Sequence, residues 1–301
     1  MRFLLRIFTV FLGVGFLCLW TWMLHVTSTQ PTDHQEAKDF STLTPDTFLH
    51  VQQLRKKKLR SFCLENPKLS GLQSVESAEH LLSRMTANEK LQMVYCKAGA
   101  TGIDAWEELL EVLTEKDDVT IETPVVDLHN LNSSLTENQE NRYNLAMVEK
   151  VFRSYTKIIF VRDPFERLVS AYTQGFAGEI TFSEFLEDVL SLERGTRDDS
   201  GTTMVSLCQP CFVQYDYIIM LDFLRAEVFH LMKRMGIPEA VLRPKFSNIQ
   251  SQLTHKWLTQ NLFRGLTSEQ ITQLSEVYQP DLEAFPFYNS LLLNNSNGKI
   301  R

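Results

Sequence analysis

Two short stretches of this 301-residue chain place basic and hydroxyl side chains at spacings that suit the binding of an anion. In one of them, Arg162 directly follows the apolar run 157–161, and Ser170 comes eight positions later. Asp163 can cap a helix and Pro164 suits its first position, so we expect a helix to begin there. Arg162 would then lie beside the positive end of that helix, where a phosphate is stabilised. A structural ion pair between Arg162 and a neighbouring acid is the competing interpretation.

The other stretch is a glycine-containing turn between an apolar run and a segment of helical periodicity. Gly99 and Gly102 permit positive φ angles and close approach of the backbone, so peptide N–H groups can point at an anion. Lys97 supplies a mobile cation and Thr101 a hydroxyl group. Taken alone this pattern is weak, because an ordinary tight turn would also explain it. The predicted binding residues are Lys97, Ala98, Gly99, Ala100, Thr101 and Gly102.

The scaffold for both stretches is an alternation of apolar strands and amphipathic helices. Apolar runs predict strands, and 3.6-residue periodicity predicts the helices that follow them. This alternation is typical of a three-layer α/β domain with a central parallel sheet covered on both faces. In such sheets ligands bind beyond the carboxyl ends of the strands, where both stretches lie. The predicted strands are 91–95, 157–161 and 215–221, and the predicted helices are 103–114, 137–155, one from Pro164 onward, and 222–235.

The first residues have the pattern of a membrane anchor. Arg2 and Arg6 precede Ile7–Val26, which carries no formal charge, and no Lys or Arg follows until Lys38. At a rise of ~1.5 Å per residue this run spans roughly the hydrocarbon core of a bilayer, and the positive-inside rule keeps the N-terminus cytosolic. A cleaved signal peptide is the alternative, but the run is long and lacks a clear small-residue cleavage site. The predicted parts are a cytosolic tail (1–6), a transmembrane signal anchor (7–26), a lumenal stem (27–62) and a catalytic domain (63–301).

The cysteines fit a lumenal, oxidising compartment. Cys18 falls inside the membrane run, which leaves Cys63, Cys96, Cys208 and Cys211. An even number is compatible with two disulfides, and four cysteines allow three pairings that the sequence does not distinguish. A zinc site at the Cys-Gln-Pro-Cys segment is less well supported, because no second Cys-x-x-Cys or pair of histidines accompanies it.

Charge restricts the partners that this chain can bind. The net charge of −7 argues against a general nucleic-acid binder, which is normally basic. Residues 55–60 nevertheless carry five basic side chains in six positions. Such a run fits a solvated helix face, or equally a docking site for an acidic substrate. Glycosylation sequons at Asn132 and Asn294 agree with a lumenal glycoprotein.

Residues 161–172 resemble the 3′-phosphate-binding motif of the Golgi carbohydrate sulfotransferases, nearly continuously over the whole stretch. The most similar group contains the chondroitin, dermatan and N-acetylgalactosamine 4-O-sulfotransferases and the glucuronyl 3-O-sulfotransferase. This resemblance implies a P-loop-like sulfotransferase fold and the donor 3′-phosphoadenosine 5′-phosphosulfate. By position, Arg162 and Ser170 would hold the 3′-phosphate of the donor.

Further motifs extend the resemblance over most of the predicted lumenal chain. The turn at Lys97 is similar to the family's 5′-phosphosulfate loop, Pro-Lys-x-Gly-x-Thr before a helix that carries a tryptophan. It departs from that loop in two ways, since Cys96 stands in place of the proline and Trp106 lies about one helical turn further along. Segments 207–218 and 278–285 resemble the family's Cys-x-Pro-Cys and Tyr-x-x-Asp patterns.

The reaction that the resemblance implies is an in-line displacement at sulfur, which requires no metal. Lys97 is the predicted catalytic cation, which neutralises charge on the leaving oxygen. His129 is the predicted general base, because a neutral imidazole accepts a proton near its reference pKa of ~6.5, and Glu107 or Glu108 are alternatives. The implied acceptor is a glycan, either the N-acetylgalactosamine of chondroitin or dermatan, or a terminal sugar of a glycoprotein. The enzyme would be a single-pass type II protein of the Golgi membrane with a lumenal catalytic domain.

Two other functions compete with this interpretation. A nucleotide-dependent kinase would need a Gly-x-x-x-x-Gly-Lys-[Ser/Thr] loop, which the chain lacks. A catalytically inactive glycan-binding relative would explain the altered turn and residues 193–206, where the family often carries His and Trp. The joint presence of Lys97, Arg162 and Ser170 favours the enzyme.

Overall fold

The structure is a computed structural model of the chain. It describes residues 43–71, 75–115, 126–127, 152–191, 201–239 and 256–287. The chain divides into a unit Met1–Thr44 and a compact unit Pro45–Arg301, and nearly all described residues belong to the second. The predicted anchor 7–26 lies outside the described residues. Within the described ranges, no helix has the length and apolar character that a membrane crossing requires.

A five-stranded mixed sheet forms the centre of the compact unit, in the order β3-β1-β2-β4-β5. Strands β2, β4 and β5 are parallel, whereas β1 runs antiparallel to both β2 and β3. The predicted parallel sheet is therefore correct for three strands and wrong for the β1 side, where a connection too short for a crossover joins β1 to β2 and forces an antiparallel pair. The strands are β1 (Met85–Asn88), β2 (Met93–Cys96), β3 (Val126–Asp127), β4 (Thr156–Val161) and β5 (Tyr217–Met220).

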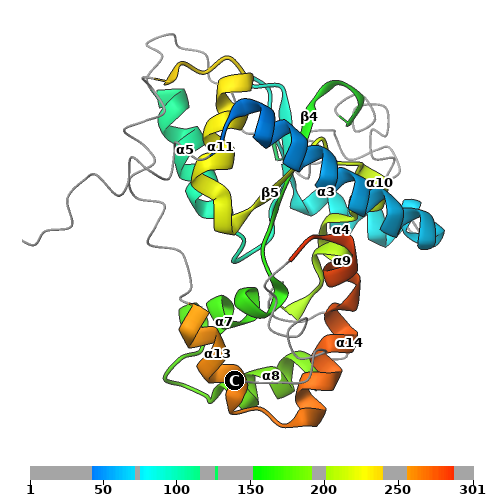
Figure 1. The fold of residues 1–301 in the computed structure, drawn as a ribbon, viewed down its shortest axis with the longest axis vertical. Coiled ribbons are helices and arrows are strands. Elements are labelled where there is room, and N and C mark those ends of the chain that lie inside the picture. The colour runs from blue at the N-terminus through cyan, green and yellow to red at the C-terminus, as the bar shows by residue number, and fades with distance from the viewer. Residues whose placement is uncertain are drawn as a thin grey trace, which may run out of the picture. The chain divides into compact units, whose positions relative to one another are not determined.

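Several helices, among them α3, α5 and α11, lie against this sheet (Figure 1). Among them, α3 and α11 contact the edge strand β5, while α7 contacts α13 and α14. The described helices are α3 (Pro45–Glu65), η1 (Pro67–Ser70), α4 (Val75–Arg84), α5 (Ile103–Glu115), α7 (Pro164–Gly175), α8 (Phe182–Ser191), α9 (Met204–Cys208), α10 (Pro210–Val213), η4 (Leu221–Phe223), α11 (Leu224–Arg234), α13 (Lys256–Arg264) and α14 (Ser268–Ala284).

Alternate residues of the central strands face opposite sides of the sheet, and both sides are buried. Ile159 and its neighbours across the sheet belong to one hydrophobic cluster, which also takes in residues of α9, α10 and the end of α14. On the other side, Tyr95 and Phe160 contact the indole of Trp106 in α5, with ring centroids 6.1 and 5.2 Å away. Helical residues thus cover both faces, as the predicted three-layer arrangement requires.

Helix α3 occupies part of the segment that the sequence analysis assigned to the stem. Its buried side chains recur every three or four positions, which is the spacing of one helix face packed against a core. The compact unit therefore begins at Pro45 rather than near Cys63. The buried residues of α3 are Phe48, Gln52, Arg55, Leu59 and Phe62.

Two disulfides confirm the prediction made from the cysteine count. They join Cys63 to Cys211 and Cys96 to Cys208. Both bonds end in the short segment at the junction of α9 and α10, so this segment is tied to the end of α3 and to the end of β2.

Candidate active site

The three parallel strands end at one edge of the sheet, and the predicted anion-binding residues follow two of these ends. The turn 97–102 leads from β2 into α5, Arg162 leads from β4 towards α7, and η4 leads from β5 into α11. In a sheet of this kind the ligand site lies beyond the carboxyl ends of the strands. The site therefore has to be built from these three connections.

A hydrogen bond and two positive φ angles define the shape of the turn 97–102. The hydroxyl of Thr101, which is fully buried, donates to the carbonyl of Ala98 at 2.6 Å. Ala100 and Gly102 both have positive φ angles, +60° and +86°. A Cβ atom added to Gly102 would lie 2.4 Å from Cδ1 of Leu221, so only glycine fits here without displacing Leu221. The hydroxyl of Thr101 thus braces the turn.

Arg162 joins the two predicted motifs. Its Nη1 donates to the carbonyl of Ala100 at 3.1 Å, and its side chain is buried. The Nε of Arg162 also lies 3.8 Å from a carboxylate oxygen of Glu166, so the competing ion-pair interpretation holds as well. Burial lowers the pKa of the guanidinium, while the nearby carboxylates of Glu166, Asp222 and Asp163 raise it. Because arginine keeps its charge in proteins, this edge of the sheet holds a buried cation.

Lys97 forms an ion pair with a carboxylate from the next helix. Its Nζ lies 2.8 Å from Oε1 of Glu107, and its side chain is 46% exposed. The hydroxyl of Tyr95 donates to the same Oε1 at 3.1 Å. Burial and the neighbouring Glu107 raise the pKa of that hydroxyl, so it stays protonated and remains a donor. The predicted catalytic cation and one of the predicted alternative bases are therefore in direct contact.

Helix α7 begins as the sequence predicts. The Asp163 side chain accepts hydrogen bonds from the backbone N–H groups of Phe165 and Glu166, at 2.9 and 3.3 Å, and Pro164 lies in the first turn. Ser170 lies further along the same helix and is 2% exposed. These contacts fix where Arg162 leaves the strand, because the helix start follows it by only two residues.

His129, the predicted base, lies outside the described residues. Asp222, which the sequence analysis did not select, follows the third parallel strand and acts electrostatically on Arg162. Its place after the strand 215–221 was the available signal, since the carboxyl-end rule applies to all three parallel strands alike.

The Tyr-x-x-Asp pattern near the C-terminus also acquires a structural role. The hydroxyl of Tyr278 donates to the carbonyl of Gly201 at 2.9 Å. The carboxylate of Asp281 accepts from the N–H groups of Met204 and Val205, at 2.8 and 2.9 Å. Nη2 of Arg167 donates to the carbonyl of Thr202 at 2.7 Å. Helices α7 and α14 thus bind residues in 201–206, the described part of the 193–206 segment. The residues that they bind are Gly201, Thr202, Met204 and Val205.

Comparison with known proteins assigns this arrangement to a family. The family model described as the sulfotransferase family matches residues 83–288. The chain is 25% identical over 273 residues to carbohydrate sulfotransferase 11 of Rattus norvegicus, covering 79% of this chain and 76% of that protein. It is 24% identical over 276 residues to carbohydrate sulfotransferase 10 of Rattus norvegicus, covering 79% and 76%. It is 23% identical over 280 residues to carbohydrate sulfotransferase 9 of Homo sapiens, covering 80% and 61%. No solved structure matches the chain significantly.

Proposed function

Because this chain belongs to the sulfotransferase family, we propose that it transfers sulfonate from 3′-phosphoadenosine 5′-phosphosulfate to a hydroxyl group of a glycan. The observation that carries the proposal is the contact between Arg162 and Ala100, which joins the two predicted donor motifs at the carboxyl edge of the sheet. The relatives reported above are all carbohydrate sulfotransferases. The acceptor that we propose is the N-acetylgalactosamine of chondroitin or dermatan, or an N-acetylgalactosamine-terminated glycan.

The described residues fit an anionic nucleotide through two cations on adjacent strand ends. Arg162 and Ser170 are proposed to hold the 3′-phosphate, which orients the reacting end of the donor. Lys97 is proposed to stabilise the negative charge that develops on the leaving oxygen. For this role Lys97 has to exchange its Glu107 partner for the donor, or share itself between the two.

Glu107 is proposed as an alternative to His129 for the role of general base. Its carboxylate lies 2.8 Å from Lys97, so it is close to the place where the acceptor hydroxyl would lose its proton. The hydroxyl of Tyr95 and the ammonium group of Lys97 both contact its Oε1, which leaves the second oxygen of the carboxylate to receive a proton.

We also propose that the protein is a single-pass type II protein of the Golgi membrane.

Transfer of a radiolabelled sulfonate group from the donor tests this proposal. The purified chain would be incubated with chondroitin, dermatan and an N-acetylgalactosamine-terminated glycoprotein. Label should enter at least one of them, and Lys97→Ala should abolish most of the transfer. Lys57→Ala, which removes an exposed lysine of α3, is the matched control. His129→Ala and Glu107→Gln identify the base, since replacement of the true base should lower kcat and leave KM nearly unchanged.

A catalytically inactive glycan-binding relative is the second candidate. The ion pair between Lys97 and Glu107 favours it, because it neutralises the one cation of the turn 97–102. This candidate predicts that the glycan binds with no need for the nucleotide and that no label is transferred.

A further inference from the structure

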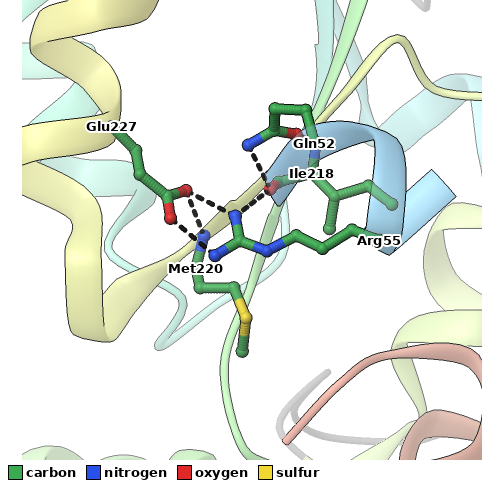
Figure 2. A network of polar contacts seen from close by, with 5 residues as sticks. All are labelled: Gln52, Arg55, Ile218, Met220 and Glu227. Carbon is green, nitrogen blue, oxygen red and sulfur yellow. Dashed lines mark hydrogen bonds and ion pairs between the residues drawn. The ribbon is translucent and has the colours of Figure 1, made fainter. Parts of the chain in front are cut away.

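The first residue of the basic run is buried in a polar network at the edge of the sheet (Figure 2). The guanidinium of Arg55 holds both carboxylate oxygens of Glu227, with both nitrogen-to-oxygen distances 2.6 Å. Its Nη1 also donates to the carbonyl of Ile218 at 2.7 Å. Both side chains are almost fully buried. Arg55 is therefore part of the folded unit and not of a solvated or docking face.

This network satisfies the free edge of β5. Among the described residues, β5 pairs with β4 and with no other strand, so the outward-facing backbone groups of Ile218 and Met220 would otherwise lack a hydrogen-bonded neighbour there. The Gln52 side chain accepts from the N–H of Ile218 at 2.8 Å and donates to its carbonyl at 3.2 Å. Oε2 of Glu227 accepts from the N–H of Met220 at 3.2 Å. Two helices far apart in the sequence, α3 and α11, thus take the place of a neighbouring strand.

The network fixes Met220, and the connection from β5 to α11 begins directly after this residue. This connection is the third one that builds the site. Met220 ends β5, and Leu221 follows with its side chain packed against Gly102 in the turn 97–102. Asp222 comes next and lies close enough to Arg162 to act on its charge. A shift of Met220 would therefore move Leu221, the neighbour of the turn 97–102, and Asp222, the neighbour of Arg162.

We infer that Arg55 and Glu227 are positioning residues for the donor site, which they support by fixing the end of β5. The inference rests on the proposed function. It also gives the basic run a role inside the fold, since Nζ of Lys58 donates to the carbonyls of Leu282 and Phe285, at 3.0 and 2.7 Å, at the end of α14. The run thus links α3 to the donor side and to α14, the last helix that the structure describes.

The test needs variants that stay folded, because removal of one partner alone leaves an uncompensated buried charge, which is strongly destabilising. Arg55→Met combined with Glu227→Met removes both charges at once and fills their place with apolar side chains. Such a replacement of a buried ion pair is often close to neutral for stability. Arg55→Lys keeps the charge but loses the planar fork that holds both oxygens. Arg60→Ala, on the exposed side of the same helix, is the matched control.

Binding of 3′-phosphoadenosine 5′-phosphate to the full chain would be measured by calorimetry, beside the melting temperature and the KM for the glycan. We expect the Kd for the nucleotide to rise at least tenfold in the double variant and in Arg55→Lys, with the KM for the glycan unchanged. Arg60→Ala should bind as the wild type does. A folded double variant, or a folded Arg55→Lys, that binds the nucleotide as the wild type does would overturn the inference alone. A wild-type chain that does not bind the nucleotide would overturn the proposed function as well.

Discussion

Replacement of Gly102 by alanine provides a demanding check on the geometry of the turn 97–102. Gly102 has a φ of +86°, and an added Cβ would lie 2.4 Å from Cδ1 of Leu221 and 3.1 Å from Cδ2 of Leu224. The strained backbone costs about 1–3 kcal/mol, and displacement of buried leucines costs about 1–3 kcal/mol more. We therefore expect the free energy of unfolding to fall by about 2–6 kcal/mol, a large part of the total stability of a domain.

Gly99 provides the matched control for this prediction. It lies in the same turn, its φ is not in the positive range, and nothing lies within 4 Å of an added Cβ. Gly99→Ala should therefore change the free energy of unfolding by less than ~1 kcal/mol. Urea unfolding with the disulfides intact measures both values. Equal losses in the two variants would refute the packing of Leu221 against the turn, and with it the link between β5 and the donor site.

Two further predictions concern the supports around the site. The pair Cys96→Ala/Cys208→Ala frees the residue that precedes Lys97, whereas Cys63→Ala/Cys211→Ala frees the end of α3. Each should lose on the order of 4–5 kcal/mol in urea unfolding, but only the first should also weaken nucleotide binding, and an equal effect of both on binding would contradict this. Burial raises the pKa of the Asp281 carboxyl from 3.8 to about 6, so its contribution to stability is full below pH 3.8 and is lost as the pH rises through 6. The free energy of unfolding of the wild type relative to Asp281→Asn should thus increase by about 2 kcal/mol from pH 7 to pH 4, and a flat difference would show that Arg167 and the two N–H groups hold the pKa near its ordinary value.

The strand and helix around Arg162 were predictable because the signals that form them are local. An apolar β-branched run precedes the arginine, and Asp163 and Pro164 follow it with the chemistry of a helix start. The structure confirms each of these elements, and the alternative ion pair with Glu166 is also present. Residues within four positions of Arg162 determine both the start of the helix and the ion pair.

Helix α3 was misassigned because its buried face carries polar residues. Gln52 and Arg55 interrupt the apolar pattern, and their partners Ile218 and Glu227 lie more than 160 positions away in the sequence. A basic run looks solvated when such partners are unknown. Strand β1 was missed for a related reason, because its Met-Thr-Ala-Asn sequence contains no apolar run. Both elements depend on contacts that only the fold brings together.

The position of Lys97 shows a third limit of the sequence. Its residue type and spacing suggested a cation available to an anion, whereas the structure pairs it with Glu107. Glu107 lies ten positions later on the next helix, and the sequence analysis considered it only as an alternative base. The ion pair could be predicted only with the path of the turn between them, which hinges on the positive φ angles at Ala100 and Gly102.

Calorimetry of nucleotide binding tests the central claim most directly. We predict that the full chain binds 3′-phosphoadenosine 5′-phosphate, and that adenosine 5′-phosphate, which lacks the 3′-phosphate, binds at least about tenfold more weakly. Arg162→Ala should remove the same difference, because the charged hydrogen bond to the 3′-phosphate is worth about 1.5–3 kcal/mol. Equal binding of the two nucleotides, or an Arg162→Ala variant that still distinguishes them, would contradict the assignment of this edge of the sheet as the donor site.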